Sequence, residues 1–180
     1  MLSTDHHASI DLSALKAQVD ADLAAQLLAE ANAAQYVNRR GFRIGELNLL
    51  VALDVSSEVA EMPAVCRLPG APHGVKGLVN RHGRVMPVMD VALLLGLKSK
   101  PVARPWLLVC GRGDAAVGLM IDNLPERKMF EHSDAINLAE ITSPIAVYAK
   151  AAYQQNNEIW IDLDTDAFFA AVFATEVTSQ

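Results

Sequence analysis

Five consecutive residues, Asn80, Arg81, His82, Gly83 and Arg84, place two guanidinium groups and an imidazole around one glycine. Groups of these types could act in acid–base catalysis, in binding of an anionic ligand, or in recognition of another protein. The same residues also suit a plain turn, because Asn and Gly tolerate turn conformations and basic side chains favour water. Apolar runs on both sides favour a tight turn between two strands that displays these side chains.

Catalysis and phosphate binding receive little support from the surrounding sequence. His82 has no carboxylate close by in the sequence to orient it as a general base, and the segment lacks the paired glycines and following helix that direct backbone N–H groups at an anion. The rest of the chain contains no serine-nucleophile motif and no glycine-rich nucleotide loop. We therefore expect no catalytic activity and no cofactor. One alternative stays open, a small β-barrel sensor that binds an anionic metabolite near Arg81, His82 and Arg84.

Alternating carboxylates near the end of the chain resemble the start of a calcium loop. Asp162, Asp164 and Asp166 have the right spacing, but Ala167 and Phe173 stand where such a loop needs Gly and Glu. A strand end that runs into a helix cap explains the same residues better, with residue 164 or 165 as the cap. The sequence therefore predicts no calcium site here.

The remaining metal-ligating residue types are also assigned no chemistry. His6 and His7 are adjacent and have no partner at metal-ligand spacing, so we expect no metal site. Cys66 and Cys110 lie in or beside apolar segments, which predicts two buried free thiols.

Composition limits the class of partner. The chain has 180 residues, 52% of them hydrophobic, and a net charge of -6, which argues against neutralisation of nucleic-acid phosphates. No apolar run approaches the length that spans a bilayer, and the first residues lack a signal-peptide pattern. We expect a cytoplasmic protein without direct membrane insertion, whose partner is another protein.

Hydrophobic periodicity predicts a helix over residues 9–36. Its apolar stripe consists of Leu12, Leu15, Val19, Leu23, Leu27 and Ala31. Two interpretations remain, a strut packed on the same chain, which we favour, and a helix that binds a partner. Its acidic polar face disfavours an anionic membrane surface.

After residue 40 the pattern changes to short apolar runs separated by Gly, Pro and Asn, as in small barrels or sandwiches. The predicted strands are 41–44, 47–53, 75–80, 84–89, 106–110, 115–121 and 159–163. Two short helices are predicted at 91–95, capped by Asp90, and at 166–174. Prolines at positions 101 and 105 mark a seam between an N-terminal and a C-terminal half.

Four segments in order resemble the CheW-like protein family. "LPGAPHGVKGLVNRHGRVMPVMDVALLLGL" at 68–97 is similar to its signature region, and "FRIGELNLLVALDVSSEV" at 42–59 to its opening hairpin and Glu-Val segment. "LLVCGRGDAAVGLMIDNL" at 107–124 resembles its second-half hairpin, and "EIWIDLDTDAFF" at 158–169 its last strand and terminal helix. The stretch "RRGFRIGE" at 39–46 and the extended N-terminus resemble the PilI-like, type IV pilus branch.

This resemblance implies a mainly β fold, with two small five-stranded SH3-like β barrels that share a hydrophobic core. It is accompanied by an N-terminal helix, a short mid-chain helix and a C-terminal helix. The implied organisation is an N-terminal extension at 1–40, a CheW-like domain at 41–174 with two intertwined barrel subdomains and a seam near 100–105, and a tail at 175–180.

The resemblance also implies a non-catalytic adaptor that couples a methyl-accepting chemoreceptor to a CheA-type histidine kinase in chemotaxis or pilus motility. One surface is expected to bind the regulatory domain of the kinase and another the cytoplasmic tip of the receptor. The implied receptor-side residues are Glu58, Val59, Gly77, Asn80, Arg81, His82 and Gly83.

This chain departs from the family at the receptor-facing turn. Where the family usually has Asn-Leu-Arg-Gly, the chain has Arg81 and His82, so the arginine is displaced by one position. On a strand-like backbone that displacement would send the arginine to the opposite face. Ser56 also replaces an apolar valine that family members commonly carry. These two differences are expected to change the affinity of the chain for its receptor, or which receptor it binds, rather than its fold.

Overall fold

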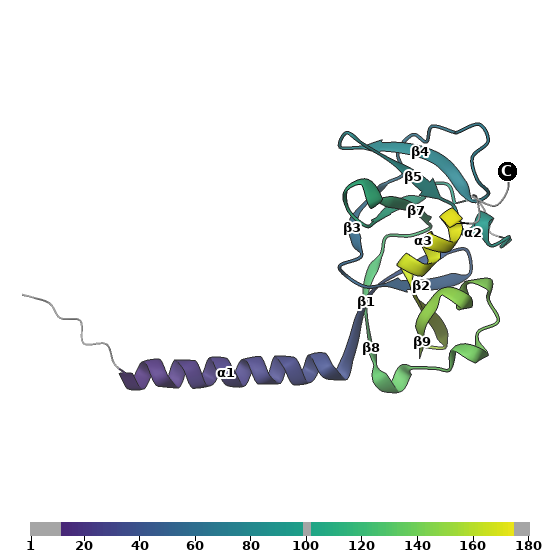
Figure 1. Cartoon of the computed structure of the whole chain (residues 1–180). Helices are drawn as coiled ribbons and strands as arrows, with labels where there is room; N and C mark the ends of the chain where they lie inside the picture. Colours follow the sequence, from purple (N-terminus) through teal and green to yellow (C-terminus); the bar gives the residue numbers. More distant parts are fainter. Residues whose placement is uncertain (1–11, 99–101, 175–180) are drawn as a thin grey trace, which may run out of the picture. The chain divides into compact units, whose positions relative to one another are not determined.

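The computed structural model describes residues 12–98 and 102–174, and these form two compact units, the first ending at Val37 and the second beginning at Asn38. The predicted tail at 175–180, His6 and His7, and the proline at position 101 lie outside the described residues. The described residues contain ten strands, most of which are labelled in Figure 1: β1 (Tyr36–Ile44), β2 (Leu47–Val51), β3 (Ser56–Glu61), β4 (Val75–Arg81), β5 (Arg84–Met89), β6 (Trp106–Cys110), β7 (Val117–Ile121), β8 (Glu126–Glu131), β9 (Ala149–Gln155) and β10 (Glu158–Leu163).

Three α-helices accompany these strands in the described ranges, α1 (Leu12–Gln35), α2 (Val91–Leu94) and α3 (Thr165–Ala174). Short 3₁₀ turns lie in the connections at η1 (Gly113–Ala115), η2 (His132–Asp134), η3 (Leu138–Glu140) and η4 (Pro144–Tyr148). The predicted N-terminal, mid-chain and C-terminal helices are confirmed within the residues described.

The strands form two five-stranded sheets, which we call barrel A and barrel B. Barrel A has the order β8-β1-β2-β10-β9 and barrel B the order β3-β6-β7-β5-β4. In each sheet, a residue that follows one edge strand bridges to the other edge. Ala135 pairs with Tyr153 in barrel A, and Cys66 pairs with Leu78 in barrel B. Closure in this way removes the exposed edges at which a sheet could pair with another chain.

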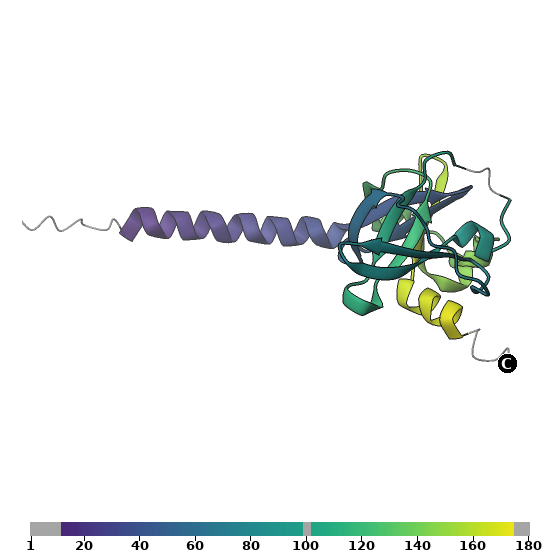
Figure 2. The ribbon, with the colours of Figure 1, turned by 90° about the horizontal axis from the view of Figure 1, so that it is seen from above.

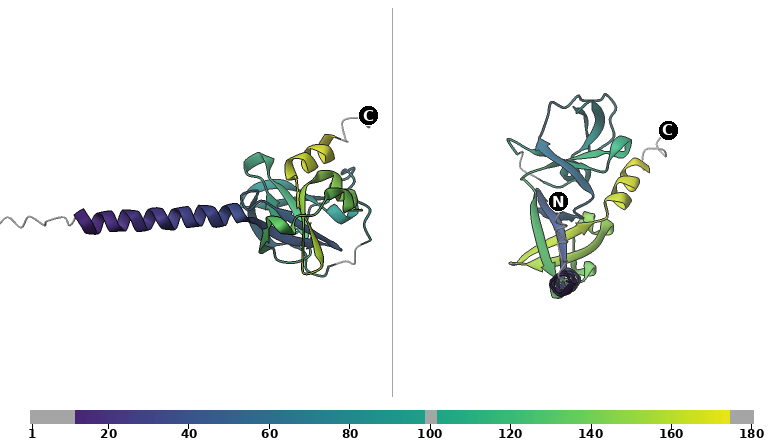
Figure 3. Two further views of the ribbon diagram at one scale, coloured as in Figure 1. Left: turned by 90° about the horizontal axis from the view of Figure 1, so that it is seen from below. Right: turned by 90° about the vertical axis from the view of Figure 1, so that its left-hand side faces the viewer.

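One hydrophobic core is shared by the two barrels. Phe42 and Leu49 of barrel A, together with Met89 and Leu108 of barrel B, are fully buried in the same cluster. α3 contributes Phe168 to this cluster, and Figures 2 and 3 show the helix outside the strands, along one side of both barrels. The shared core predicted from the resemblance is confirmed.

The chain changes barrel twice, after β2 and after β7, so the barrels are intertwined. Asp122 reinforces the second crossing, because its Oδ2 accepts a 2.6 Å hydrogen bond from the backbone N–H of Gly45 in the β1–β2 turn. The predicted seam near 100–105 does not coincide with either change: β6 follows it and still pairs with β3 in barrel B.

Most strands lie where hydrophobic runs predict them, but β3, β8 and β9 escaped the sequence pattern. β8 reads ERKMFE and β9 reads AKAAYQQ, and neither alternates clearly between apolar and polar residues. Their stability comes from pairing with neighbours and from single buried residues such as Phe130. β1 also begins at Tyr36 rather than at 41, because Asn38, Arg39 and Arg40 interrupt the apolar run from which the strand was predicted.

The helix caps agree with their prediction. The Asp90 carboxylate accepts a hydrogen bond from the backbone N–H of Leu93 at 3.0 Å at the start of α2. At α3 the two predicted candidates resolve to Asp164, which accepts from the backbone N–H of Ala167 at 3.0 Å. That hydrogen bond, acting against slight desolvation, holds the pKa of Asp164 below its usual value.

Within the residues described, the first unit consists of α1 and the first two residues of β1. The composition of α1 is rich in Ala, Leu and Gln, which favour the helix, and it contains neither Gly nor Pro. Val19, Leu23 and Leu27 of the predicted apolar stripe are more than half exposed, at 57%, 54% and 58%. Both interpretations of this helix, a strut packed on the same chain and a helix that binds a partner, remain predictions.

Candidate functional site

The tip of the β4–β5 hairpin, residues 80–84, is a two-residue turn between Arg81 and Arg84, which pair directly. His82 and Gly83 occupy its centre with φ values of 51° and 79°. Positive φ at both central positions is what the right-handed twist of a tight hairpin requires, and His is one of the few side chains that adopts it readily. The Asn80 side chain accepts a 3.1 Å hydrogen bond from the backbone N–H of Gly83, which stabilises the turn. The predicted turn is confirmed.

A carboxylate from another strand lies against this tip. Arg81 donates from Nε to Glu58 Oε1 at 2.7 Å and approaches the same oxygen with Nη2 at 2.6 Å. His82 Nε2 lies 3.3 Å from that oxygen. Because β3 and β4 are the two edge strands of barrel B, Glu58 links both edges of the barrel. The sequence separated these groups by more than twenty residues, and the fold brings them together.

The charge of Glu58 depends on this arrangement. Partial burial by itself raises the pKa of the Glu58 carboxyl, but the hydrogen bond and positive charge of Arg81, together with His82, outweigh burial and leave the pKa below its usual value. The three side chains differ in exposure: Glu58 and Arg81 keep 30% and 33% of their surface exposed, and His82 keeps 72%. Glu58 and Arg81 therefore form a partly desolvated pair, with the imidazole on the outside.

The expectation that Arg81 and the next residue point to opposite faces was wrong. That argument assumed a strand-like backbone through residue 82, whereas His82 has a left-handed φ and already belongs to the turn. The turn brings both side chains to one oxygen of Glu58. Displacement of the arginine by one position therefore leaves it beside the same carboxylate.

Val59 and Gly77, two further residues of the implied receptor side, do not lie at the exposed tip. Val59 is half-buried and packs against the shared core, on the other side of β3 from Glu58. Gly77 is buried with a φ of 145°, and a Cβ atom there would collide with the backbone oxygen of Cys66. It thus permits the paired hydrogen bonds between Cys66 and Leu78, each 2.8 Å long, that close barrel B. A residue with a side chain at position 77 would force the two backbones apart.

Two features of the tip region were missed or only partly seen in the sequence. Val85, which pairs with Asn80, exposes 64% of its surface and adds an apolar patch beside the basic side chains. A strand pattern alone does not show which face of the strand is exposed to solvent, so the sequence did not predict the exposure of Val85. Ser56 is buried, and its hydroxyl has no hydrogen-bond partner among the described residues.

The carboxylates that resembled a calcium loop have separate structural roles. Asp162 is buried in β10 and accepts a 2.7 Å hydrogen bond from Arg39 Nε. Burial raises the pKa of Asp162, and Arg39 opposes part of that effect. Asp164 caps α3, as described above. In the described ranges, no three His, Cys, Asp or Glu side chains are grouped closely enough to hold a metal ion.

The two cysteines differ from each other. Cys110 is buried, and burial raises the pKa of its thiol to about 12. Cys66 is exposed, so the prediction of two buried thiols was wrong for this residue. Its backbone pairs with Leu78 at the closure of the barrel, and this pairing does not bury its side chain.

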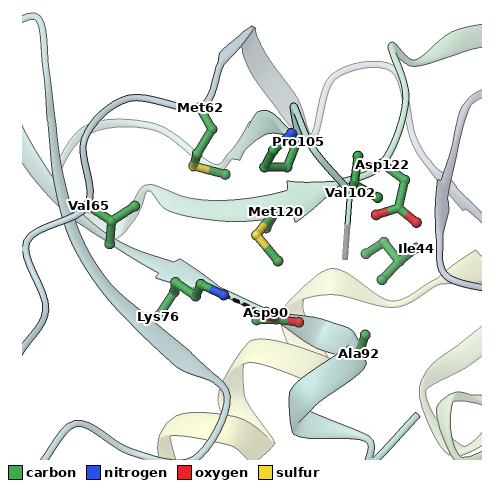
Figure 4. Close-up of a pocket in the computed structure, with 10 residues that line it drawn as sticks. All are labelled: Ile44, Met62, Val65, Lys76, Asp90, Ala92, Val102, Pro105, Met120 and Asp122. Atoms are coloured by element: carbon green, nitrogen blue, oxygen red, sulfur yellow. Dashed lines mark hydrogen bonds and ion pairs between the residues drawn. The ribbon is translucent and has the colours of Figure 1, made fainter. Parts of the chain in front are cut away.

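A cavity of about 320 Å³ lies elsewhere on the second unit (Figure 4). Its walls are mostly apolar, and its charged groups are Lys76, Asp90 and Asp122. The ammonium of Lys76 lies 3.4 Å from the carboxylate of Asp90, as the dashed line in Figure 4 shows. Two carboxylates and one paired ammonium do not favour an anion. Arg81, His82 and Arg84 do not line this cavity.

Comparison with known proteins identifies the family to which this fold and these residues belong. Residues 41–173 match the CheW-like domain. The chain belongs to the CheW-like domain family. None of the helices in the described part of this family member is long and apolar enough to cross a bilayer.

Relatives of the CheW-like chain include proteins of two kinds. Protein PilI of Pseudomonas aeruginosa is 34% identical over 103 residues, which cover 57% of this chain and 58% of PilI. Chemotaxis protein CheW of Thermotoga maritima is 24% identical over 136 residues, covering 75% of this chain and 89% of that protein. Chemotaxis protein CheW of Rhizobium meliloti is 30% identical over 97 residues, covering 51% of this chain and 63% of that protein.

A solved structure agrees with the fold. The scaffolding protein TtCheW from Thermoanaerobacter tengcongensis superposes with a TM-score of 0.64 at 15% identity, over 71% of this chain and 84% of its own. At this identity the likeness supports the two-barrel fold alone.

Proposed function

We propose that this chain is a non-catalytic adaptor that couples a methyl-accepting chemoreceptor to a CheA-type histidine kinase in chemotaxis or pilus motility. The observation that carries the proposal is the match of residues 41–173 to the CheW-like domain, with relatives named PilI and CheW. The expected cytoplasmic location belongs to this proposal. PilI is 34% identical over 103 residues, compared with 24% over 136 residues for the CheW protein of Thermotoga maritima, and this higher identity favours the pilus branch.

The receptor-binding surface in this proposal is the β4–β5 tip together with Glu58. Arg81 is held by Glu58 in one orientation, and a guanidinium has five N–H donors, of which Nε and one Nη2 donor suffice for Glu58. Such a preorganised donor binds a partner at a low cost in side-chain entropy. Val85 supplies apolar area beside it. Charged donors next to an exposed apolar side chain are typical of protein interfaces rather than of small-molecule sites.

Within this surface the expected residues have different roles. Arg81 and Asn80 supply and position hydrogen-bonding groups, and His82 and Gly83 give the turn its shape. Val59 and Gly77 support barrel B behind the tip, so we assign them to the framework of the receptor side. The kinase is proposed to bind elsewhere on the barrels.

The alternative function, a sensor for an anionic metabolite, receives no support from the family or from its relatives. At the tip, Arg81 is already paired with a carboxylate, which competes with an anion. A thermal-shift series with phosphate, sulfate, carboxylates and nucleotides tests it directly, because ligand binding raises the melting temperature. We expect no shift.

Reconstitution from purified components tests the proposed function. The full chain is mixed with the CheA-type kinase and a receptor signalling fragment encoded by the same genome, and the mixture is separated by size. We expect the chain to co-elute with each partner and to make kinase activity depend on the receptor. A correctly folded chain that retains neither partner would contradict the proposal.

Two variants separate receptor binding from kinase binding. If the exchange of the usual arginine for His82 had abolished receptor binding, the natural chain would bind the kinase alone and His82→Arg would acquire the receptor. Since Arg81 already lies at Glu58, we expect the natural chain to bind the receptor and His82→Arg to change that affinity less than tenfold. Gain of binding only in His82→Arg would show that Arg81 does not replace the missing group.

A further inference from the structure

α1 carries a stripe of five exposed residues whose spacing is symmetric. Lys16, Val19, Leu23, Leu27 and Glu30 follow one another at intervals of three, four, four and three residues. At about 100° per residue, Lys16 and Glu30 project within about 20° of Leu23, and Val19 and Leu27 within about 40°. All five side chains are exposed. The stripe therefore has an apolar centre and one charged residue of each sign at its ends.

This pattern is self-complementary under a two-fold axis through Leu23. In an antiparallel pair of α1 helices, Leu23 meets its own copy, Val19 meets Leu27, and Lys16 meets Glu30 of the other chain. A two-fold interface requires each contact to occur twice in this way. In a parallel pair, Lys16 would face Lys16 and Glu30 would face Glu30, and like charges at close range repel.

Helix formation also gains from such a pair. A single helix in water is only marginally stable, and most helical stability in proteins comes from packing of an apolar face. α1 exposes more than half of the surface of Val19, Leu23 and Leu27. Its acidic residues disfavour an anionic membrane surface, as the sequence indicated. A second copy of the chain satisfies both the apolar centre and the two charged ends.

We propose that α1 is a homodimerisation helix, and that two copies of the chain associate through antiparallel α1 helices centred on Leu23. The buried surface of one helix pair is at the small end of specific interfaces, so the dimer is reversible and depends on concentration. It is independent of receptor and kinase binding, and the two can fail separately.

Sedimentation equilibrium of the full chain over a wide concentration range measures the association. Wild type should form dimers, and Leu23→Glu should abolish them because it places two carboxylates at the two-fold axis. Leu28→Glu is the matched control, since Leu28 projects about 140° away from Leu23 and is also exposed, at 65%. It should dimerise like wild type. Monomers of wild type at every concentration, or equal loss in both variants, would overturn the proposal.

Charge reversal tests the antiparallel arrangement. Lys16→Glu and Glu30→Lys should each weaken the dimer at least tenfold, and the double variant should restore it, because the opposite charges again face each other. In a parallel pair the double variant would still place like charges together, so failure to restore the dimer would overturn the antiparallel arrangement. Circular dichroism and thermal unfolding show that each variant keeps its helix and its barrels.

Cross-linking gives an independent readout. In a Cys66→Ser background, a mixture of Val19→Cys and Leu27→Cys chains should form mixed disulfide dimers. Each variant alone should form few. Cross-links between identical Val19→Cys chains would indicate parallel helices and overturn the proposal. A chain that stays monomeric, and whose melting temperature falls in Leu23→Glu but not in Leu28→Glu, would show that α1 packs on its own barrels instead.

Discussion

Arg81 at the end of β4 and Glu58 on β3 join the two edge strands of barrel B through a single carboxylate oxygen, 2.7 Å from Nε and 2.6 Å from Nη2. The same oxygen lies 3.3 Å from His82 in the turn. Glu58 thus fixes the orientation of the basic tip that we assign to receptor binding. The ionised Glu58 carboxylate therefore holds Arg81 in one orientation and adds a side-chain contact between the two edge strands.

The pH dependence of stability should report this contact. The pKa of Glu58 is lowered from 4.5 in the folded chain, so its contribution is present above that value and is lost as pH falls through the lower folded pKa. We expect Glu58→Gln to reduce the free energy of unfolding at pH 7 by up to about 1 kcal/mol, because about a third of each side chain is exposed and solvent screens the pair. The gap between wild type and variant, measured by denaturant unfolding, should close on acidification.

An Arg81→Gln background supplies the control for this prediction. Without the guanidinium the cause of the lowered pKa is removed, so Glu58→Gln should then have little effect at either pH. A gap that widens as the pH falls would contradict the assignment of the contact.

Two glycines with positive φ should respond differently to alanine. Gly83 has open space around the position of a Cβ atom, so Gly83→Ala should cost only the backbone strain, about 1 kcal/mol. Gly77→Ala adds a collision with the backbone of Cys66 and should cost several times more, about 3 kcal/mol or above. Thermal or denaturant unfolding measures both. Equal losses would show that barrel B does not close at Cys66 as described.

The sequence predicted those parts of the fold whose signal is local. The turn at His82 and Gly83, the cap at Asp90 and the apolar strands follow from turn chemistry, capping and short hydrophobic runs. β8 and β9 were missed because their residues are polar or small and their pairing depends on neighbours far away in the chain. The sequence also did not predict which strands belong to which barrel, because the crossing after β7 depends on contacts such as that between Asp122 and Gly45.

The candidate site was predicted in composition but not in geometry. The sequence named Glu58, Arg81 and His82 through the resemblance to the family. It did not show that all three side chains meet at one oxygen. That meeting depends on the left-handed φ of His82, which turns its side chain toward Glu58. Exposure of Val85 and of Cys66 depends on which face of a closed barrel is open, and a single sequence does not contain that information.

Thiol reactivity should distinguish the two cysteines. Cys66 is exposed, whereas Cys110 is buried with a pKa of about 12, and only a thiolate attacks a disulfide reagent. We expect the folded chain to react rapidly at one thiol with Ellman's reagent, and the second to react only after unfolding. Cys66→Ser should abolish the rapid phase. Two rapid thiols, or a rapid phase that survives in Cys66→Ser, would contradict the burial of Cys110.

The unpartnered hydroxyl of Ser56 should make its removal harmless. A buried polar group without a hydrogen bond destabilises the fold, so Ser56→Ala should leave the free energy of unfolding unchanged or raise it by up to about 1 kcal/mol. Chemical denaturation measures the difference. A loss greater than about 1 kcal/mol would indicate that the hydroxyl has a partner in the folded chain.

The central claim is that Arg81, held by Glu58, binds the receptor, and titration calorimetry of the full chain with the signalling fragment of a receptor from the same genome tests it most directly. Arg81→Ala should bind at least tenfold more weakly than wild type, a loss of about 1.4 kcal/mol. Arg127→Ala, which removes an exposed arginine from β8 of barrel A, is the matched control and should bind like wild type. Equal affinity of wild type and Arg81→Ala, with both correctly folded, would contradict the account.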